Sequence, residues 1–226
     1  MSDASGIEID GSRPFDIVLA TANPYKAAEI GEIFGHFIGL DLNLLARPVE
    51  IPEVEETGTT LVENARLKAA AITRATKKMS VADDTGLFVD ALDGAPGVHS
   101  ARYAGDGATD RDNVERLLVE MDGVENRRAT FRTVALAISA DGGELVAMGE
   151  VHGTIAVAAR GNHGFGYDPV FIPDELAGQT FAELETDEKH TLSHRGRAFR
   201  ALAAMILQER LRDTRAAEAM TRDWTT

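Results

Sequence analysis

The chain has 226 residues, and 37 acidic against 23 basic residues give it a net charge of −14. This surplus of negative charge argues against nucleic acid polymers and anionic membranes as partners, and a small anionic substrate would need a local basic pocket or a divalent cation. No apolar run reaches about 18 residues, so we expect no membrane span. Without cysteine there are no disulfides or thiolate metal sites, which fits a cytoplasmic protein.

The chain reads as one compact unit. Residues 1–13 are expected to form a flexible leader and residues 213–226 a flexible tail. Between them, residues 14–212 contain neither a linker-like composition nor an internal repeat, so we expect a single domain there.

The first expected elements are a buried strand over residues 15–21 and a helix directly after it. Asn23 is a suitable N-cap and Pro24 suits the first helical position. The helix has an apolar stripe at helical spacing, made of Ile30, Ile33, Phe34, Phe37 and Ile38. The turn before it offers backbone N–H groups, the positive end of the helix dipole and the charge of Lys26, a combination suited to phosphate.

A second helix is predicted from residue 60 onward, because Thr60 and Glu63 form a capping-box pattern. Asn64 and Lys68 are four residues apart and share a face of this helix. The preceding segment, residues 53–58 (EVEETG), is a cluster of carboxylates. Carboxylates in a chain without cysteine suit a hard, oxygen-liganded ion such as Mg²⁺, although a solvated acidic loop has the same composition.

Residues 79–90 (MSVADDTGLFVD) predict a strand and loop in which Asp83 and Asp84 interrupt an apolar run. Adjacent residues of a strand point to opposite faces, so we expect the strand to end here and both carboxylates to reach one cleft. The alternative is an Asx-type turn starting at Asp84. An aspartic protease, suggested by the letters Asp-Thr-Gly, needs two such loops, and the chain has one.

The remaining elements alternate between helix and strand. Residues 108–123 predict a helix with a buried stripe of Val114, Leu117, Leu118 and Met121. Residues 128–139 and 144–157 predict a hairpin around Asp141-Gly142-Gly143. Residues 193–212 predict the last helix, with Ser193 as N-cap and Leu202, Met205 and Ile206 buried. This order indicates an α/β fold with a mixed sheet.

Two further segments carry candidate binding groups. In residues 164–169 (GFGYDP), glycines flank Phe165, whose ring can stack on a purine, and Asp168 can accept from a base edge. Residues 188–196 (EKHTLSHRG) bring Lys189, His194 and Arg195 together as a local basic group in an acidic chain.

Together these motifs resemble the inosine triphosphate pyrophosphatase family, which acts on non-standard purine nucleoside triphosphates such as dITP and XTP. The matching segments, in family order, are LATANPYK, EETGTTLVENARLKA, ADDTGLFVDALDGAPGVHSARYAG, GFGYDPVFIP and EKHTLSHRGRA. The resemblance implies an elongated fold around a long mixed sheet, two lobes with the active-site cleft between them, and a homodimer. It also implies Mg²⁺-dependent cleavage of the α–β phosphoanhydride to the monophosphate and pyrophosphate.

The resemblance implies roles for individual residues. Asp84 corresponds to a metal ligand and general base, with Asp83 beside it, and Glu56 to a metal ligand. The residues implied to bind substrate are Thr21, Ala22, Asn23, Pro24, Tyr25, Lys26, Lys68, Thr85, Phe165, Gly166, Tyr167, Asp168, Lys189, His194 and Arg195. Two positions depart from the family pattern. Ala22 replaces a glycine, which could stiffen the phosphate turn, and Thr85 replaces a serine while keeping the hydroxyl.

The implied mechanism is attack of water on the α-phosphorus, with Asp84 taking the proton and Lys26 and Lys68 stabilising the triphosphate. Donors directed at O6 would select inosine or xanthosine over adenosine. Two alternatives stay open. A septum-inhibitor-type (Maf-type) nucleotide pyrophosphatase would have the same chemistry with another base preference, and a nucleotide sensor would bind without cleavage.

Overall fold

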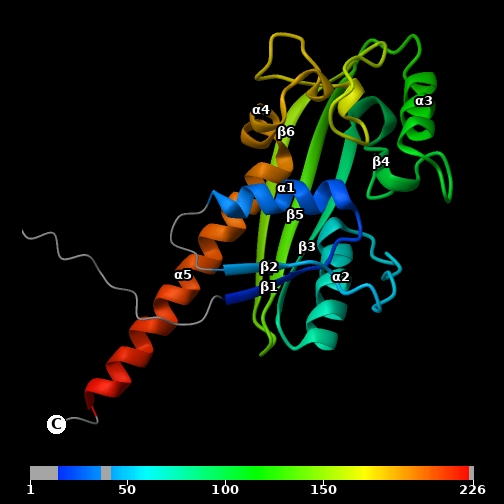
Figure 1. Ribbon diagram of the computed structural model, residues 1–226. Helices are drawn as coiled ribbons and strands as arrows, with labels where there is room; N and C mark the ends of the chain where they lie inside the picture. The colour runs from blue at the N-terminus through cyan, green and yellow to red at the C-terminus, as the bar shows by residue number, and fades with distance from the viewer. Residues whose placement is uncertain (1–14, 37–41, 224–226) are drawn as a thin grey trace, which may run out of the picture.

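The protein is described by a computed structural model that covers residues 15–36 and 42–223. Its framework is a seven-stranded sheet in the order β2-β1-β3-β5-β6-β7, with β4 paired to β3 outside this path (Figure 1). The strands are β1 (Phe15–Leu19), β2 (Leu42–Leu45), β3 (Met79–Val89), β4 (Pro96–Gly97), β5 (Arg128–Ile138), β6 (Glu144–Ile155) and β7 (Phe171–Pro173). Because β1 is parallel to β2 and β3 while the other pairs are antiparallel, the sheet is mixed, as predicted.

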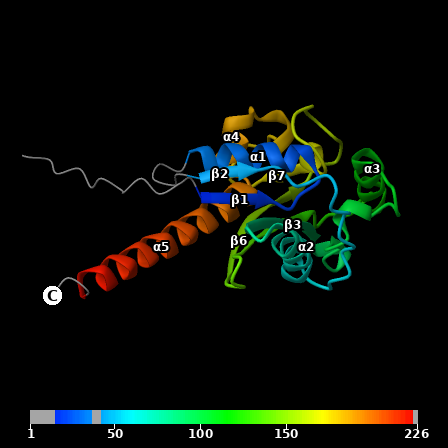
Figure 2. The same ribbon diagram turned by 60° about the horizontal axis from the view of Figure 1, so that its bottom comes forward.

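Helices cover both faces of this sheet (Figures 1 and 2). They are α1 (Pro24–Gly35), α2 (Leu61–Thr76), α3 (Asp110–Glu120), α4 (Thr186–Leu192) and α5 (His194–Asp223), with short 3₁₀ turns at Asp90–Leu92, Ser100–Arg102, Asp168–Val170 and Phe181–Glu183. α2 packs on β3 and β5, whereas α5 packs on β6 and β5 and against α1. The C-terminal half of α5 extends away from the sheet (Figure 1).

The buried side chains show how β3 divides the two faces. Val81 packs in a cluster with residues of α1 and α5, whereas its neighbour Ala82 packs in a second cluster with residues of α2. A third cluster joins the far end of β3 and β5 to α3 and β7, around Phe131 and Phe171. The alternation of β3 therefore sends residues 81 and 83 toward α1 and α5, and residues 82 and 84 toward α2.

The predicted helix starts are confirmed. The Asn23 side chain caps α1 by accepting from the backbone N–H groups of Tyr25 and Lys26, at 2.9 and 3.2 Å. Thr60 and Glu63 form the expected capping box of α2. Phe37 and Ile38, predicted to extend the stripe of α1, lie outside the described residues, as do the leader residues 1–13.

Two expectations were wrong in detail. β3 does not end at the paired aspartates, and no Asx turn starts at Asp84, because β3 stays paired with β5 from Ser80 to Val89. α5 continues to Asp223, into the range expected to form a tail, and the flexibility of that range stays a prediction. No helix in the described ranges is long and apolar enough to cross a membrane.

Candidate active site

On the α2 face of β3, the carboxylates of Glu56 and Asp84 meet at one ammonium group. Lys68 Nζ lies 2.7 Å from Glu56 Oε1 and 3.0 Å from Asp84 Oδ1. The other Asp84 oxygen accepts from Asn64 Nδ2 at 3.2 Å. Lys68 and Asn64 lie one turn apart on α2, as their spacing predicted, so a single helix supplies both contacts.

Burial and the neighbouring charges shift the pKa values of Asp84 and Lys68. Burial raises the pKa of Asp84 above its ordinary value, with Lys68 opposing this shift and Glu56 adding to it. Burial alone would lower the pKa of Lys68, but Asp84, Asp83 and Glu56 outweigh it and the net pKa is raised. Lys68 therefore stays charged, while Asp84 holds a proton more readily than an exposed aspartate does.

Asp83 belongs to the opposite face of β3 and to a different ion-pair group. Its Oδ2 lies 3.1 Å from Lys26 Nζ and 3.2 Å from Arg195 Nε. Burial would raise the pKa of Asp83, but Lys26 and Arg195 hold it well below its usual range. The other oxygen, Oδ1, is buried and has no hydrogen-bond partner among the residues that the structure describes. Two adjacent carboxylates are thus stabilised by separate sets of cations.

Glu29, which the sequence analysis did not single out, connects the basic residues of the last motif. Its carboxylate contacts Arg195 Nη1 at 2.6 Å and Lys189 Nζ at 2.7 Å. Lys189 also lies 2.7 Å from Asp168 Oδ2. Glu29 follows Lys26 by three residues on α1 and is only 8% exposed. A charged residue on the buried side of a helix needs a partner, and this was the signal available in the sequence.

The loop that was predicted to read a base packs over these cations. The ring of Phe165 stacks on Tyr25 with centroids 5.7 Å apart, and Lys189 Nζ and the Arg195 guanidinium lie 4.9 and 5.2 Å from its centroid. Asp168 Oδ2 accepts from the Phe165 N–H at 2.8 Å. The same carboxylate oxygen therefore holds both the loop backbone and the Lys189 ammonium group in place. Burial raises the pKa of Asp168, and Lys189 opposes this.

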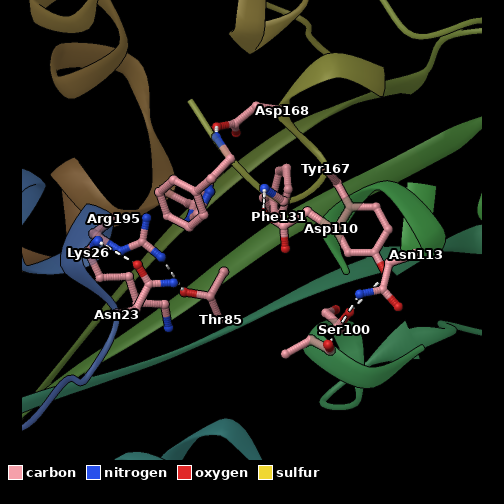
Figure 3. A pocket seen from close by; sticks show the side chains of 14 residues that line it. Asn23, Lys26, Thr85, Ser100, Asp110, Asn113, Phe131, Tyr167, Asp168 and Arg195 are labelled. Atoms are coloured by element: carbon pink, nitrogen blue, oxygen red, sulfur yellow. Dashed lines mark hydrogen bonds between the residues drawn. The ribbon is translucent and has the colours of Figure 1, made fainter. Parts of the chain in front are cut away.

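Beside this loop lies a cavity of about 120 Å³ (Figure 3). It is lined by Asn23, Lys26, Thr85, Ser100, Ala101, Asp110, Asn113, Phe131, Phe165, Gly166, Tyr167, Asp168, His194 and Arg195. Two contacts fix its far wall. The Tyr167 hydroxyl donates to the Ser100 carbonyl at 2.9 Å, and the Gly166 N–H donates to Asp110 at 2.7 Å. The cavity therefore combines aromatic walls with a cationic edge.

A second hollow of about 300 Å³ is lined by the candidate phosphate-binding residues. Its lining includes Thr21, Ala22, Asn23, Lys26, Arg47, Glu56 and Lys68. Asn23, Lys26 and Ala101 line both hollows, so the N-terminal turn of α1 forms part of the wall between them. The structure thus brings the predicted phosphate turn next to the Glu56–Lys68–Asp84 group.

The phosphate turn is more self-contained than expected. Thr21 Oγ1 accepts from the Asn23 N–H at 3.1 Å, and the Asn23 side chain occupies the next two N–H groups. Pro24 has none. The backbone N–H groups of Asn23, Tyr25 and Lys26 are therefore already paired, so the helix dipole and the side chains of Lys26 and Lys68 gain weight as phosphate-binding groups. Ala22 is accommodated without strain, because Lys77 and Asp93 are the only non-glycine residues of the described ranges with positive φ.

His194 lies at the start of α5 against the cavity. Its ring stacks on Phe131 with centroids 4.4 Å apart, and Nδ1 lies 2.6 Å from Thr133 Oγ1. Burial, Arg195 and Lys189 lower the pKa of His194 well below its ordinary value, so the imidazole is neutral at neutral pH. Thr133 was not predicted as a site residue, since it occurs in an ordinary β-branched run.

A separate group of ligand-type side chains joins α1 and α4. Atoms of Glu32, Asp187 and His190 lie within 4.8 Å of one another. Glu32 and Asp187 are exposed, and His190 Nδ1 already contacts Glu32 at 2.8 Å. We assign no ligand to this group.

Comparison with known proteins identifies relatives across most of the chain. A sequence model of the Ham1 family matches residues 17–205. The dITP/XTP pyrophosphatase of Nitratidesulfovibrio vulgaris is 49% identical over 194 residues, covering 82% of this chain and 93% of the relative. The dITP/XTP pyrophosphatase of Bacillus subtilis is 45% identical over 193 residues, covering 84% of this chain and 96% of the relative. The family resemblance seen in the motifs is thereby confirmed.

Solved structures agree with this relationship and with the predicted α/β fold. The Ham1 protein of Staphylococcus aureus superposes with a TM-score of 0.76 at 39% identity, covering 86% of this chain and 99% of that chain. A protein of Mycobacterium abscessus, described as a nucleoside-triphosphatase and dITP/XTP pyrophosphatase, gives a TM-score of 0.67 at 38% identity, covering 85% of this chain and 100% of that chain. From the family match and the identity to these relatives, the chain belongs to the Ham1 family.

Proposed function

We propose that the protein is an Mg²⁺-dependent pyrophosphohydrolase that converts non-standard purine nucleoside triphosphates (dITP, ITP and XTP) to the monophosphate and pyrophosphate. The observation that carries this proposal is the pair of adjoining hollows. One has aromatic walls and a neutral histidine, and the other has two lysines beside the carboxylates of Glu56 and Asp84. The relatives named dITP/XTP pyrophosphatase support the same substrate class.

The donor set fits a divalent cation of the hard type. Glu56 and Asp84 offer carboxylate oxygens, which Mg²⁺ prefers, and Lys68 Nζ between them shows that this place stabilises positive charge. Glu56 and Asp84 would hold the ion. Asp83 is the third candidate through its Oδ1, which has no partner in the described part of the chain, although its position on the other face of β3 makes it the weaker one. Bound Mg²⁺ would neutralise phosphate charge and polarise the scissile phosphoanhydride.

Asp84 is the proposed general base. A base works best when its pKa approaches the working pH, and burial shifts the pKa of Asp84 in that direction. It accepts the proton of a water molecule that attacks the α-phosphorus. The bond from this phosphorus to the bridging oxygen breaks, and pyrophosphate leaves with the bonding electrons. Lys26 and Lys68, which line the second hollow, offset the charge of the phosphates.

Base selection is assigned to the first hollow. Phe165 offers a ring face for stacking, and His194 and Arg195 lie at the cationic edge of the cavity. Donors that face O6 of hypoxanthine or xanthine would lose their partner against the amino group of adenine. A site built to hydrogen-bond one group rejects the analogue that lacks it more strongly than a purely apolar pocket does.

The test is release of pyrophosphate from dITP, ITP, XTP, dATP and dUTP, with and without Mg²⁺. We expect Mg²⁺-dependent release from the first three, loss of release in Asp84→Asn, and no change in Asp122→Asn, which alters an exposed aspartate. A preference for dUTP would favour a Maf-type pyrophosphatase. Nucleotide binding without pyrophosphate would identify a sensor instead. Full activity in Asp84→Asn would overturn the catalytic assignment.

Assembly and location complete the proposal. By its resemblance to the family the protein is proposed to form a homodimer, which light scattering coupled to size-exclusion chromatography tests directly. A cytoplasmic location would place it with the nucleotide pool, and cell fractionation with an antibody to the chain tests this. A monomer, or a chain recovered outside the cytoplasm, would contradict the respective part.

A further inference from the structure

A chain of partly and fully buried hydrogen bonds leads from Arg195 to the imidazole of His194. Arg195 Nη2 donates to Thr85 Oγ1 at 3.2 Å, Thr85 Oγ1 lies 2.7 Å from Thr133 Oγ1, and Thr133 Oγ1 lies 2.6 Å from His194 Nδ1. Thr85 and Thr133 are directly opposite each other in the β3–β5 register. Their side chains therefore meet on one face, and two strands and the first turn of α5 build the chain together.

Three arrangements satisfy all three contacts, but one of them, in which Thr133 accepts from both neighbours, leaves its buried hydroxyl proton without a partner among the described residues. Two arrangements remain. Each threonine has one hydroxyl proton, and a neutral histidine has one ring N–H. In the first arrangement, Thr85 donates to Thr133 and Thr133 donates to His194 Nδ1, so the ring proton is on Nε2. In the second, Thr85 donates to Asp83, Thr133 donates to Thr85, and Nδ1–H donates to Thr133, so Nε2 carries a lone pair.

The contacts of Asp83 favour the first arrangement. Asp83 Oδ2 already receives Lys26 Nζ at 3.1 Å and Arg195 Nε at 3.2 Å, and its contact with Thr85 is the longest of the set at 3.3 Å. Arg195 can only donate, so the chain has a fixed donor at one end. Because Arg195 donates to Thr85 in both arrangements, the choice rests on the crowding at Asp83 Oδ2. When Thr85 gives up its long bond to that oxygen, it donates to Thr133, and Thr133 donates to Nδ1.

The other ring nitrogen of His194, Nε2, takes no part in this chain of hydrogen bonds. His194 lines the cavity, and within the described part of the chain Nδ1 is the only ring nitrogen with a hydrogen bond. His194 is 3% exposed and Thr133 is fully buried, so water does not compete for these bonds. A proton held on Nε2 is therefore left over for a ligand in the cavity that His194 lines.

We propose that Thr133 is a positioning residue that fixes His194 as the Nε2–H tautomer and thereby makes the cavity selective for 6-oxo purines. This inference rests on the proposed function for its substrates, but the tautomer itself does not depend on catalysis. With Nε2 as donor, a 6-oxo group is paired and a 6-amino group meets a second donor. With Nε2 as acceptor the preference would be reversed at this contact.

The kinetic test replaces Thr133 by valine, which keeps the shape and removes the hydroxyl. We expect the ratio of kcat/KM for dITP to that for dATP to fall about tenfold, the loss of roughly one neutral hydrogen bond. Thr133→Ser should restore the ratio. Thr130→Val is the matched control, because Thr130 lies on β5 like Thr133 but does not line the cavity. This substitution also removes a contact between a threonine and a histidine, the 3.0 Å contact of Thr130 Oγ1 with His152 Nδ1. An unchanged ratio in Thr133→Val would overturn the selectivity.

The spectroscopic test measures the tautomer in the full chain without nucleotide. Two-bond ¹H–¹⁵N spectra distinguish protonated from unprotonated ring nitrogens, and His194→Gln assigns the signal. We expect protonated Nε2 in the wild type and in Thr133→Ser, and mixed tautomers in Thr133→Val. If Thr133→Val does not fold, Thr133→Ala removes the same hydroxyl group, and mixed tautomers are expected there as well. Protonated Nδ1 in the wild type overturns the inference, whereas absent pyrophosphate release with protonated Nε2 overturns only the proposed function.

Discussion

Asp83 and Asp84 are neighbours in the chain, yet they face opposite sides of β3 and are neutralised by different elements. Asp83 contacts Lys26 of α1 and Arg195 of α5, whereas Asp84 contacts Lys68 of α2. The same type of side chain is thus held in two environments, and the pKa is raised in Asp84 and lowered in Asp83. This difference predicts different consequences for the same substitution.

Asp84→Asn should remove activity without removing the fold. We expect kcat for dITP to fall at least about a hundredfold, because general acid–base catalysis contributes on this scale. The free energy of unfolding should change little, because burial already disfavours the charged form of Asp84. Steady-state kinetics and urea unfolding of the same preparation measure both quantities.

Asp83→Asn should instead destabilise the protein. The substitution leaves Lys26 and Arg195 facing a neutral group in a buried place, and breaking a buried ion pair costs about 3 kcal/mol or more. Urea unfolding compares it with Asp84→Asn as its matched control. Equal free energies of unfolding for the two variants would contradict the separation of the two faces.

Glu29→Gln should destabilise the protein in a pH-dependent way. Burial would raise the pKa of Glu29, but Arg195 and Lys189 outweigh it and the net pKa lies below the ordinary value of 4.5. The carboxylate therefore contributes stability above that value, and the contribution is lost as pH falls through the lowered pKa of the folded state. The difference in free energy of unfolding between wild type and Glu29→Gln should be about 3 kcal/mol at neutral pH and should shrink in acid.

Urea unfolding at about pH 7, 5 and 3.5 measures this difference. Glu115→Gln is the control, because the Glu115–Arg111 pair is exposed on α3 and such pairs contribute little. A difference that stays constant down to the lowest pH would refute the role of the Glu29 carboxylate.

Phe165→Ala should weaken substrate binding more than turnover. Stacking of a base on an aromatic ring is worth about 1–3 kcal/mol, so KM for dITP should rise about tenfold or more while kcat changes less. Phe165→Trp should keep most of the affinity. Val157→Ala, which alters a side chain that is 84% exposed, serves as the control. A fall in kcat alone would place Phe165 outside base binding.

Chelation of divalent cations should abolish pyrophosphate release, and added Mg²⁺ should restore it. In Glu56→Gln the Mg²⁺ concentration for half-maximal activity should rise about tenfold, because one charged oxygen ligand becomes neutral. A titration of activity against Mg²⁺ measures this, with Glu55→Gln as the neighbouring control. Activity that survives chelation would remove the metal from the proposal.

Local signals in the sequence predicted much of the fold. Asn23 and Thr60 are caps whose partners lie within three residues, so helix starts were readable. The end of β3 could not be predicted in the same way, because pairing with β5 continues the strand through Asp83 and Asp84. This pairing depends on residues about fifty positions away in the sequence. An apolar run interrupted by charges looks like a strand end when its neighbour is unknown.

Site residues that belong to a sequence motif were predicted, whereas residues that join the site only through contacts with distant parts of the chain were missed. Lys26, Lys68, Phe165 and Arg195 were expected and lie around the two hollows. Glu29 and Thr133 were missed, because their partners Arg195 and His194 are distant in sequence. The sequence offered one sign of Glu29, a charged residue on the buried side of α1, and none of Thr133, which lies in an ordinary strand.

The N-terminal turn of α1 belongs to both hollows, and this constrains how the protein can evolve. Lys26 lines the aromatic cavity and the hollow beside Glu56 alike, and it also neutralises Asp83. A substitution of Lys26 would therefore alter base binding, phosphate binding and the stability of the fold together. Thr133 and Phe165 do not line the hollow beside Glu56 and do not contact Asp83. A lineage that acquires a new nucleobase preference can therefore mutate these two positions while the hollow with Glu56 and Lys68 stays unchanged.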